Sequence, residues 1–126
     1  MEFYRDEKGN LTKLAQHNVD TGMGLERMCK VMQNKVSVYE TDLFTPMLNL
    51  LAKTTGLSYA EHQRRFRIVA DHIRTAFMLI NDGLTPSNVG AGYVLRMIIR
   101  RAYYNLYLLK KIDRGELECF IADAFK

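Results

Sequence analysis

Apolar residues recur at helical spacing over most of the chain. Leu25, Met28, Cys29 and Met32 lie three or four positions apart or side by side, which is the pattern of one helix face. A longer stripe of the same kind is formed by Phe66, Val69, Ala70, Ile73, Ala76, Phe77 and Ile80. Each stripe predicts an amphipathic helix whose apolar face packs against neighbouring elements.

The segment before Gly56 predicts a helix of its own, with apolar positions Leu43, Phe44, Met47, Leu48 and Leu51. Thr41 or Asp42 is expected to be its N-cap, because a side-chain oxygen there can accept from an unpaired amide of the first turn. Pro46 suits this helix because it falls in or near the first turn. Gly56 is expected to end the helix.

The second half of the chain predicts further helices. Ser58 is expected to cap a short helix through Arg65, directly before the long apolar stripe. Residues 81–88, "NDGLTPSN", hold the densest turn signal in the sequence. A long helix is expected from about Gly92 to Lys111, and residues 113–125 begin another.

The first 19 residues follow a different pattern. Phe3–Arg5 and Leu11–Leu14 flank the turn-rich residues 6–10, which predicts a β-hairpin. Val19 is expected on a third short strand. The predicted fold class is therefore mainly α, with a short N-terminal β-hairpin or strand remnant followed by about five helices.

Composition limits the class of protein. The chain has 126 residues, 48% of them hydrophobic and 25% charged, which suits one domain with a core. Its apolar runs are far shorter than the roughly 20 residues of a membrane-spanning helix, and no signal segment opens it, so we expect a cytoplasmic protein without a membrane partner. Cys29 and Cys119 lack partners at metal-ligand spacing, so no zinc site is expected.

Positive charge is concentrated in one segment. Between Asp82 and Asp113 the sequence has no acidic residue, although the whole chain carries only +4. The basic residues of this segment are Arg96, Arg100, Arg101, Lys110 and Lys111. A patch of one sign attracts polyanions, which makes RNA or DNA a candidate partner. On charge alone, a solvated helix face is the alternative interpretation.

The long helix predicted at 92–111 carries two further faces beside its core stripe. One combines basic and aromatic side chains, namely Arg96, Arg100, Tyr103 and Tyr107, which suits phosphate contacts and stacking on a nucleic acid. Another is formed by Met97, Tyr104 and Leu108. Because apolar side chains nearly encircle the helix, a neighbouring protein domain is an alternative to RNA as its partner.

The segment "NVDTGMGLER" at 18–27 carries the densest candidate chemistry. The glycines at 22 and 24 would let a ligand approach the backbone, and Arg27 offers a planar, permanently charged fork for phosphates. From the local pattern alone, an ordinary capped turn into a helix explains the same residues.

Five segments, in order and spacing, resemble the alanyl-tRNA synthetases, a family of class II synthetases. They are "VDTGMGLER" at 19–27, "YETDLF" at 39–44, "RIVADHIR" at 67–74, "LINDGLTPSN" at 79–88 and "GYVLRMIIRRA" at 92–102. The resemblance covers roughly residues 1–111. A chance match of five linked motifs is very rare.

The resemblance implies substrate roles for the first segment. "DTGMGLER" resembles motif 3 of the class II catalytic fold, a strand leading into a helix that lines the aminoacyl-adenylate site. Arg27, beside Gly24, would bind the phosphates of ATP. Asp20 would accept a hydrogen bond from the ammonium group of the amino acid, and Gly22 would shape the small alanine pocket.

The helices that follow resemble the family's tRNA-recognition region, which holds the acceptor stem. Asn88 would contact the minor groove near the wobble pair that defines tRNA identity. The arginines expected to approach the same stem are Arg96, Arg100 and Arg101. Family members usually carry arginines where this chain has Ala91 and Met97, so we expect weaker RNA binding with a shallower salt dependence.

The resemblance also predicts a domain division. Residues 1–34 would be the C-terminal part of a class II catalytic domain, and residues 35–126 the N-terminal part of a helical tRNA-recognition domain. Nothing in the sequence resembles the family's motifs 1 and 2 or the zinc cluster of its editing domain. Because a class II site needs groups from several strands, the chain is expected to be an internal fragment of an alanine-tRNA ligase, inactive alone.

The expected ligands and partners follow from the same resemblance. In the parent enzyme they are ATP with Mg²⁺, alanine, the tRNA acceptor stem and the remaining synthetase domains; this chain alone is expected to bind no cofactor. His72 is expected to be a packing residue, since no nucleophile and base are paired around it. The alternative is a stand-alone, synthetase-derived RNA-binding or protein-interaction helical module without ligase activity.

Overall fold

The structure is a computed structural model that describes residues 2–19 and 21–125. Asp20, one of the expected amino-acid ligands, lies outside the described residues. The elements are β1 (Phe3–Arg5), β2 (Leu11–Lys13), α1 (Leu25–Met32), the 3₁₀ turn η1 (Val38–Glu40), α2 (Thr45–Thr55), α3 (Tyr59–Asn81), α4 (Gly90–Leu109) and α5 (Arg114–Ala124). The predicted class, mainly α with an N-terminal hairpin, is confirmed.

The N-terminal hairpin forms as predicted, with Tyr4 paired to Thr12 in an antiparallel register. Asp6 holds the turn, since its Oδ1 accepts from the amides of Lys8 and Asn10 at 2.9 and 2.8 Å. The Asn10 side chain also donates to Asp6 Oδ2 at 3.0 Å. This hydrogen bond, followed by those from the backbone amides, lowers the pKa of the Asp6 carboxyl. The strand predicted at Val19 is wrong, because among the described residues no strand lies beside it to pair with.

Helix α2 begins later than its expected cap. Thr41 is completely buried and its hydroxyl donates to the carbonyl of Val38 at 2.6 Å, so it stabilises η1 and the following turn instead of capping α2. The N-cap is Phe44, without a side-chain hydrogen bond, and Pro46 lies in the first turn. Gly56 ends the helix in the left-handed conformation (φ 71°) as expected.

Residues 59–81 form α3, in which two helical stretches meet at a kink, because the backbone of His62 is not helical (φ −121°, ψ 25°). Ser58 occupies the N-cap position as expected, and the boundary predicted after Arg65 lies at His62 instead. No proline or glycine lies between 59 and 81, so nothing in the backbone breaks the helix after Arg65.

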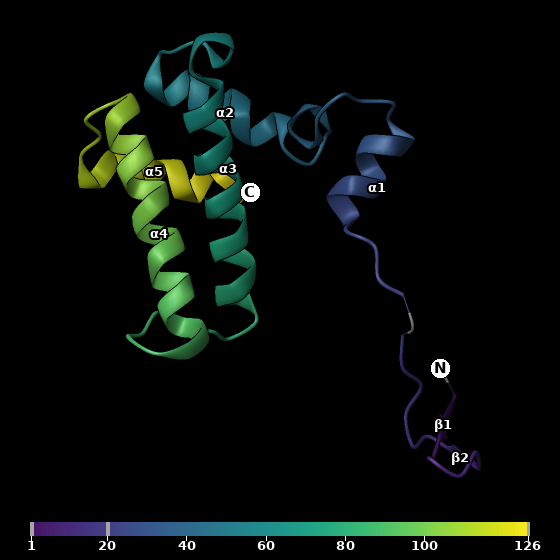
Figure 1. The fold of residues 1–126 in the computed structure, drawn as a ribbon. Helices are drawn as coiled ribbons and strands as arrows, with labels where there is room; N and C mark the ends of the chain where they lie inside the picture. The colour runs from purple at the N-terminus through teal and green to yellow at the C-terminus, as the bar shows by residue number, and fades with distance from the viewer. Residues whose placement is uncertain (1, 20, 126) are drawn as a thin grey trace.

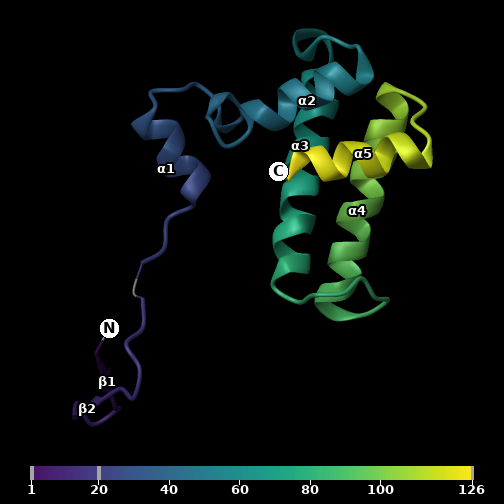
Figure 2. The same cartoon turned by 180° about the vertical axis from the view of Figure 1, so that it is seen from behind.

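Helices α3 and α4 run antiparallel, joined by the turn at residues 82–89, with α2 at the opposite end of the pair (Figure 1). Helix α5 crosses this pair, as the reverse view shows (Figure 2). The main core lies where these helices meet, and its buried members are Phe44, Met47, Leu48, Leu51, Phe66, Val69, Ala70, Leu106, Ile112 and Phe120. The apolar stripe of α3 is buried only in part, since Phe77 and Ile80 are exposed.

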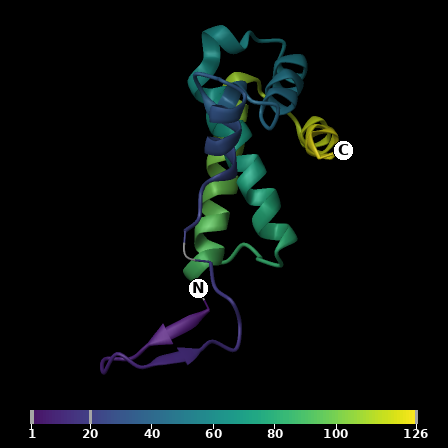
Figure 3. The same ribbon diagram turned by 90° about the vertical axis from the view of Figure 1, so that its right-hand side faces the viewer.

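The hairpin lies apart from the helical body in all three views (Figures 1 to 3), and α1 lies to one side of the body in Figures 1 and 2. Helix α1 has no buried residue, and the side chains of Leu25, Val31 and Met32 are 58%, 73% and 76% exposed. Such an apolar face normally packs against a neighbour. Within the described residues, the ion pair between Glu26 and Arg74 of α3 links α1 to the helical body at 3.6 Å.

Candidate substrate-binding surfaces

The motif that resembles a nucleotide site lies at the start of α1. Gly24 is the N-cap of α1, and Arg27 lies in its first turn. A Cβ at Gly24 would touch the Arg27 side chain at 3.7 Å, whereas one at Gly22 would meet nothing within 4 Å. The Arg27 guanidinium is exposed and has no hydrogen bond or ion pair with any described residue. Arg27 is therefore an exposed cation without a described partner, and it lies near Gly22 and Gly24, which have no side chains.

Arg27 also borders a hollow of about 550 Å³ between α1 and α3. Arg74 lines the same hollow, held by Glu26 on one side and lying 5.7 Å from the centre of the Phe44 ring. Of the two guanidinium groups, that of Arg74 is paired with Glu26 and that of Arg27 has no described partner. Glu26 and Asp71 border the hollow as well, so this wall alone carries no net positive charge.

The turn that carries Asn88 is held against α4 at Gly92. The Ser87 amide donates to the Gly92 carbonyl at 3.0 Å, and the Ser87 hydroxyl donates to the Val89 carbonyl at 2.8 Å. The Asn88 side chain is exposed and has no hydrogen bond to another described residue. A rigid turn thus presents a free amide, which can both donate and accept.

The structure separates the three arginines expected on α4. Arg96 and Arg100 are exposed on the face of α4 that also carries Tyr103 and Tyr107, whose rings are 6.4 Å apart. Arg101 lies five positions after Arg96, which is about 140° around the helix. It faces the groove between α3 and α4 instead.

That groove contains basic residues that the charge pattern of residues 82–113 does not include. Two adjoining hollows, of about 680 and 520 Å³, share Arg64 and Arg101 in their walls. Arg65 lines the first hollow and Arg67 the second. The signal is present in the sequence as three arginines within "RRFR" at 64–67, but only folding places them against a residue of α4.

Asp71 does not pair with either neighbouring arginine, although its spacing from Arg67 and Arg74 on the helix allows it. Its Oδ2 lies 2.9 Å from Nδ1 of His72. Arg67 instead donates to the Tyr59 hydroxyl at 2.9 Å and to Gln63 at 3.2 Å. The His72 side chain is only 15% exposed and held by this contact.

Arg67 is further fixed by aromatic rings. Its guanidinium carbon lies 5.1 Å from the centre of the Tyr39 ring and 5.9 Å from that of Tyr59, both within cation–π range. Burial, followed by the negative charge of Asp71, raises the pKa of the Tyr39 hydroxyl. The positive charge in this part of the groove is therefore held in a fixed position.

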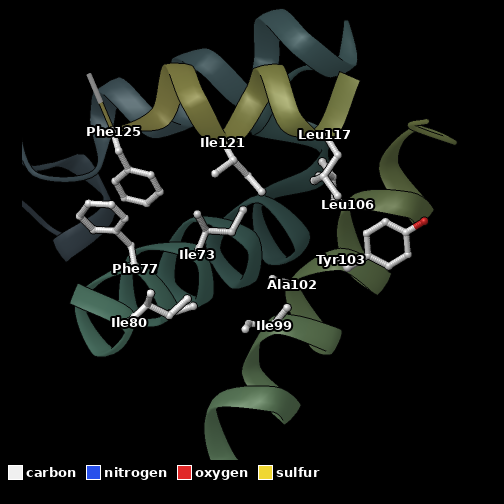
Figure 4. A pocket seen from close by; sticks show the side chains of 11 residues that line it. Ile73, Phe77, Ile80, Ile99, Ala102, Tyr103, Leu106, Leu117, Ile121 and Phe125 are labelled. Atoms are coloured by element: carbon white, nitrogen blue, oxygen red, sulfur yellow. The ribbon is translucent and has the colours of Figure 1, made fainter. Parts of the chain in front are cut away.

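A separate apolar pocket of about 200 Å³ lies between α3, α4 and α5 (Figure 4). Phe77 and Phe125 stack across one end of it, with ring centres 3.8 Å apart and planes 8° from parallel. Tyr103 supplies the one hydroxyl among its lining residues. Such a lining cannot hold phosphates, so the pocket belongs to the packing of α5.

Metal-ligating clusters and membrane-spanning helices are absent from the described residues. No group of three or more His, Cys, Asp or Glu side chains there is arranged to hold a metal ion. No helix in the same ranges is both long enough and apolar enough to span a bilayer.

Comparison with known proteins gives the family. Residues 1–117 match the family described as tRNA synthetases class II (A), so the chain belongs to the class II tRNA synthetases. It is 51% identical over 109 residues to the alanine–tRNA ligase of Neisseria meningitidis serogroup C / serotype 2a (strain FAM18). It is 48% identical over 111 residues to that of Thermotoga sp. (strain RQ2). Within the class, the chain belongs to the alanyl-tRNA synthetases.

The alignments cover most of this chain but only a small share of each relative. Each alignment covers 86% of this chain, but only 12% of the Neisseria protein and 13% of the Thermotoga protein. The chain thus corresponds to one segment of a much longer type of polypeptide.

Proposed function

We propose that this chain acts as part of an alanine-tRNA ligase, contributing one wall of the ATP and alanine site and part of the surface that holds the tRNA acceptor stem. The observation that carries this proposal is the identity of about half the aligned positions to alanine–tRNA ligases over 86% of the chain. Residues 1–117, which match the class II family, include the candidate site residues. The enzyme would join alanine to tRNA while ATP is converted to AMP and pyrophosphate.

Arg27 and Gly24 would hold the nucleotide. The support is an exposed guanidinium without a described partner beside a backbone free of a side chain. ATP with Mg²⁺ would supply the activated phosphate, while Arg27 would orient and neutralise it. Gly22 would leave room for the methyl group of alanine, and Asp20, which is outside the described residues, would bind its ammonium group.

Asn88 would read the acceptor stem, supported by Arg96, Arg100 and Arg101. The free amide of Asn88 on a fixed turn suits the wide, shallow minor groove of an A-form helix. The arginines would contact phosphates and so add affinity without sequence preference. Because Arg96 and Arg101 face different directions, the stem would extend around more than one face of α4.

The chain alone would not activate alanine. One arginine-bearing wall cannot surround a reacting phosphate, and the apolar face of α1 is uncovered within the described residues. The remaining domains of a synthetase would cover that face and complete the site.

A graft tests the proposal. We would replace the aligned segment of the Neisseria enzyme with this chain and measure ATP–pyrophosphate exchange and alanine transfer to tRNA. Both activities are expected, and Arg27→Ala should lower exchange by about 10²-fold or more. Lys30→Ala, in the last turn of the same helix, is the matched control. A folded graft without exchange, or full exchange with Arg27→Ala, would contradict the proposal, as would exchange by the isolated chain.

The second candidate is a stand-alone module that binds RNA or a protein without ligase activity. The observation that favours it is the exposure of Met97, Tyr104 and Leu108, at 44%, 61% and 42%, on one face of α4. A protein-binding module predicts that Met97→Asp abolishes partner capture while the graft lacks activity. An active graft would support the ligase function and contradict the stand-alone module.

A further inference from the structure

The groove between α3 and α4 has more arginines than carboxylates in its walls. Its two hollows are lined by four arginines, namely Arg64, Arg65, Arg67 and Arg101, against two carboxylates, Glu61 and Asp71. A concave wall with an excess of one sign focuses the electrostatic field and attracts a polyanion. The groove therefore has the shape and charge of a phosphate-binding surface.

Three of the four arginines of the groove are available for a ligand, whereas Arg67 is engaged by Tyr59 and Gln63. Arg64, Arg65 and Arg101 are exposed, and none has an ion pair or side-chain hydrogen bond with a described residue. Of the two carboxylates, Asp71 is engaged by His72. Like charges gathered in this way repel one another, and an anion between them would relieve that repulsion.

The groove also offers contacts suited to a nucleic acid rather than to a small anion. Tyr104 is 61% exposed and lines the first hollow. An exposed aromatic ring beside arginines suits stacking and phosphate contacts with a nucleic acid. The two hollows adjoin through Arg64, Ile68 and Arg101, so the surface is long enough for more than one phosphate.

We propose that this groove, lined by Arg64, Arg65, Arg67 and Arg101, binds the sugar–phosphate backbone of RNA. The inference deepens the proposed function and rests on it for RNA as the partner. It adds Arg64, Arg65 and Arg67 of α3 to the RNA surface and assigns Arg101 to the groove.

The position of the groove relates it to both candidate sites. Arg101 lies eleven residues from the start of α4, which is about 17 Å along the helix from the Asn88 turn. At the other side, Asp71 borders both the groove and the hollow that contains Arg27. RNA held in the groove would thus adjoin the nucleotide wall at Asp71 and lie along α4 from the turn that carries Asn88.

Binding of a fluorescent acceptor-stem minihelix to the full chain, measured by anisotropy at two salt concentrations, tests the inference. The groove variant Arg64→Gln/Arg101→Gln should bind about 5- to 30-fold more weakly. Its salt slope should fall by about 1 for each phosphate that the variant no longer neutralises. The hairpin variant Arg5→Gln/Lys8→Gln removes the same charge from exposed residues far from the groove and should bind as the wild type does.

Equal weakening in the groove and hairpin variants would overturn the inference, as would unchanged binding by the groove variant. In the Neisseria graft, the groove variant should raise KM for tRNA and leave ATP–pyrophosphate exchange unchanged. If the graft is active and the groove variant leaves KM for tRNA unchanged, the inference that the groove binds RNA would be overturned while the proposed function would stand. A graft without ATP–pyrophosphate exchange would overturn the proposed function. The anisotropy measurement would still show whether the groove binds RNA.

Discussion

Gly92 and Ser87 are packed so closely that no side chain fits between them. A Cβ at Gly92 would overlap the Ser87 hydroxyl and lie 2.6 Å from the Thr85 carbonyl oxygen. The Ser87 amide also donates to the Gly92 carbonyl at 3.0 Å. The glycine of "GYVLRM" therefore serves to dock the turn that carries Asn88, and its backbone needs no left-handed conformation.

Gly92→Ala should displace that turn. Because one of the overlapped atoms belongs to the backbone, the turn cannot yield by a rotamer change, and we expect a decrease of about 1–3 kcal/mol in the free energy of unfolding. The amide resonances of residues 85–89 should shift, and minihelix binding should weaken. Chemical denaturation and two-dimensional NMR would measure these effects.

The matched control is Gly115→Ala in the first turn of α5. There a Cβ would meet only the Asp113 carboxylate, at 3.4 Å, and alanine favours the helix. We expect unchanged or slightly higher stability. If Gly92→Ala were equally harmless, the close packing of the turn against α4 would be refuted.

The sequence predicts a helix well where the apolar pattern of one helix face determines its position. It predicts less well where tertiary contacts determine how a helix begins. Periodicity locates α1, α4 and α5, and Gly56 marks the end of α2 correctly. The predicted cap of α2 is wrong because Thr41 is buried and bonds to Val38 instead. No local rule shows that a threonine will be enclosed by the core.

The candidate site is predictable to a similar extent. Linked motifs point to Arg27 and Asn88, and the structure leaves both side chains exposed. The basic groove could not be predicted, because Arg64 and Arg101 belong to different helices and meet through antiparallel packing. The prediction of a strand at Val19 is wrong because a strand also depends on a neighbour that is distant in sequence, and the described residues provide no partner strand there.

Phe66 anchors the core between α2 and α3. Its side chain is completely buried and lies edge-on to Tyr59 at 5.9 Å. Phe66→Ala should lower the free energy of unfolding by about 3–5 kcal/mol, a large fraction of a small domain's stability. Phe66→Leu should lower it by less than about 1.5 kcal/mol. Phe3→Ala, at a residue that is 51% exposed, should have almost no effect in the same urea titration.

The stacked pair Phe77 and Phe125 holds the end of α5 over the apolar pocket. Phe125→Ala removes the stack and should lower stability by about 1–2 kcal/mol. Because Phe120 still anchors the middle of α5 in the core, the change should be local. Hydrogen exchange should accelerate in α5 and not in the buried part of α3. Equal acceleration in both helices would show instead that α5 does not open on its own.

The pH dependence of α5 packing follows from Glu116. Its Oε1 accepts from Lys110 Nζ at 2.7 Å, and Lys110 also donates to the Thr54 carbonyl at 3.3 Å. The same carboxylate completes the capping box with Asp113. The hydrogen bond from Lys110, followed by that from the Asp113 amide, lowers the pKa of Glu116 below its ordinary 4.5.

A lowered carboxyl pKa stabilises the folded chain above pH 4.5, and this contribution disappears as the pH falls through the folded-state pKa. Glu116→Gln keeps the shape but removes the charge, so it should lower Tm slightly at pH 7 and leave Tm unchanged at a pH well below the folded-state pKa. Glu118→Gln removes a helix-surface pair with Arg114 at 2.8 Å and should change Tm by about a degree or less. A Tm difference between wild type and Glu116→Gln that persists at low pH would mean that the packing of the side chain, and not its charge, connects α2, α4 and α5.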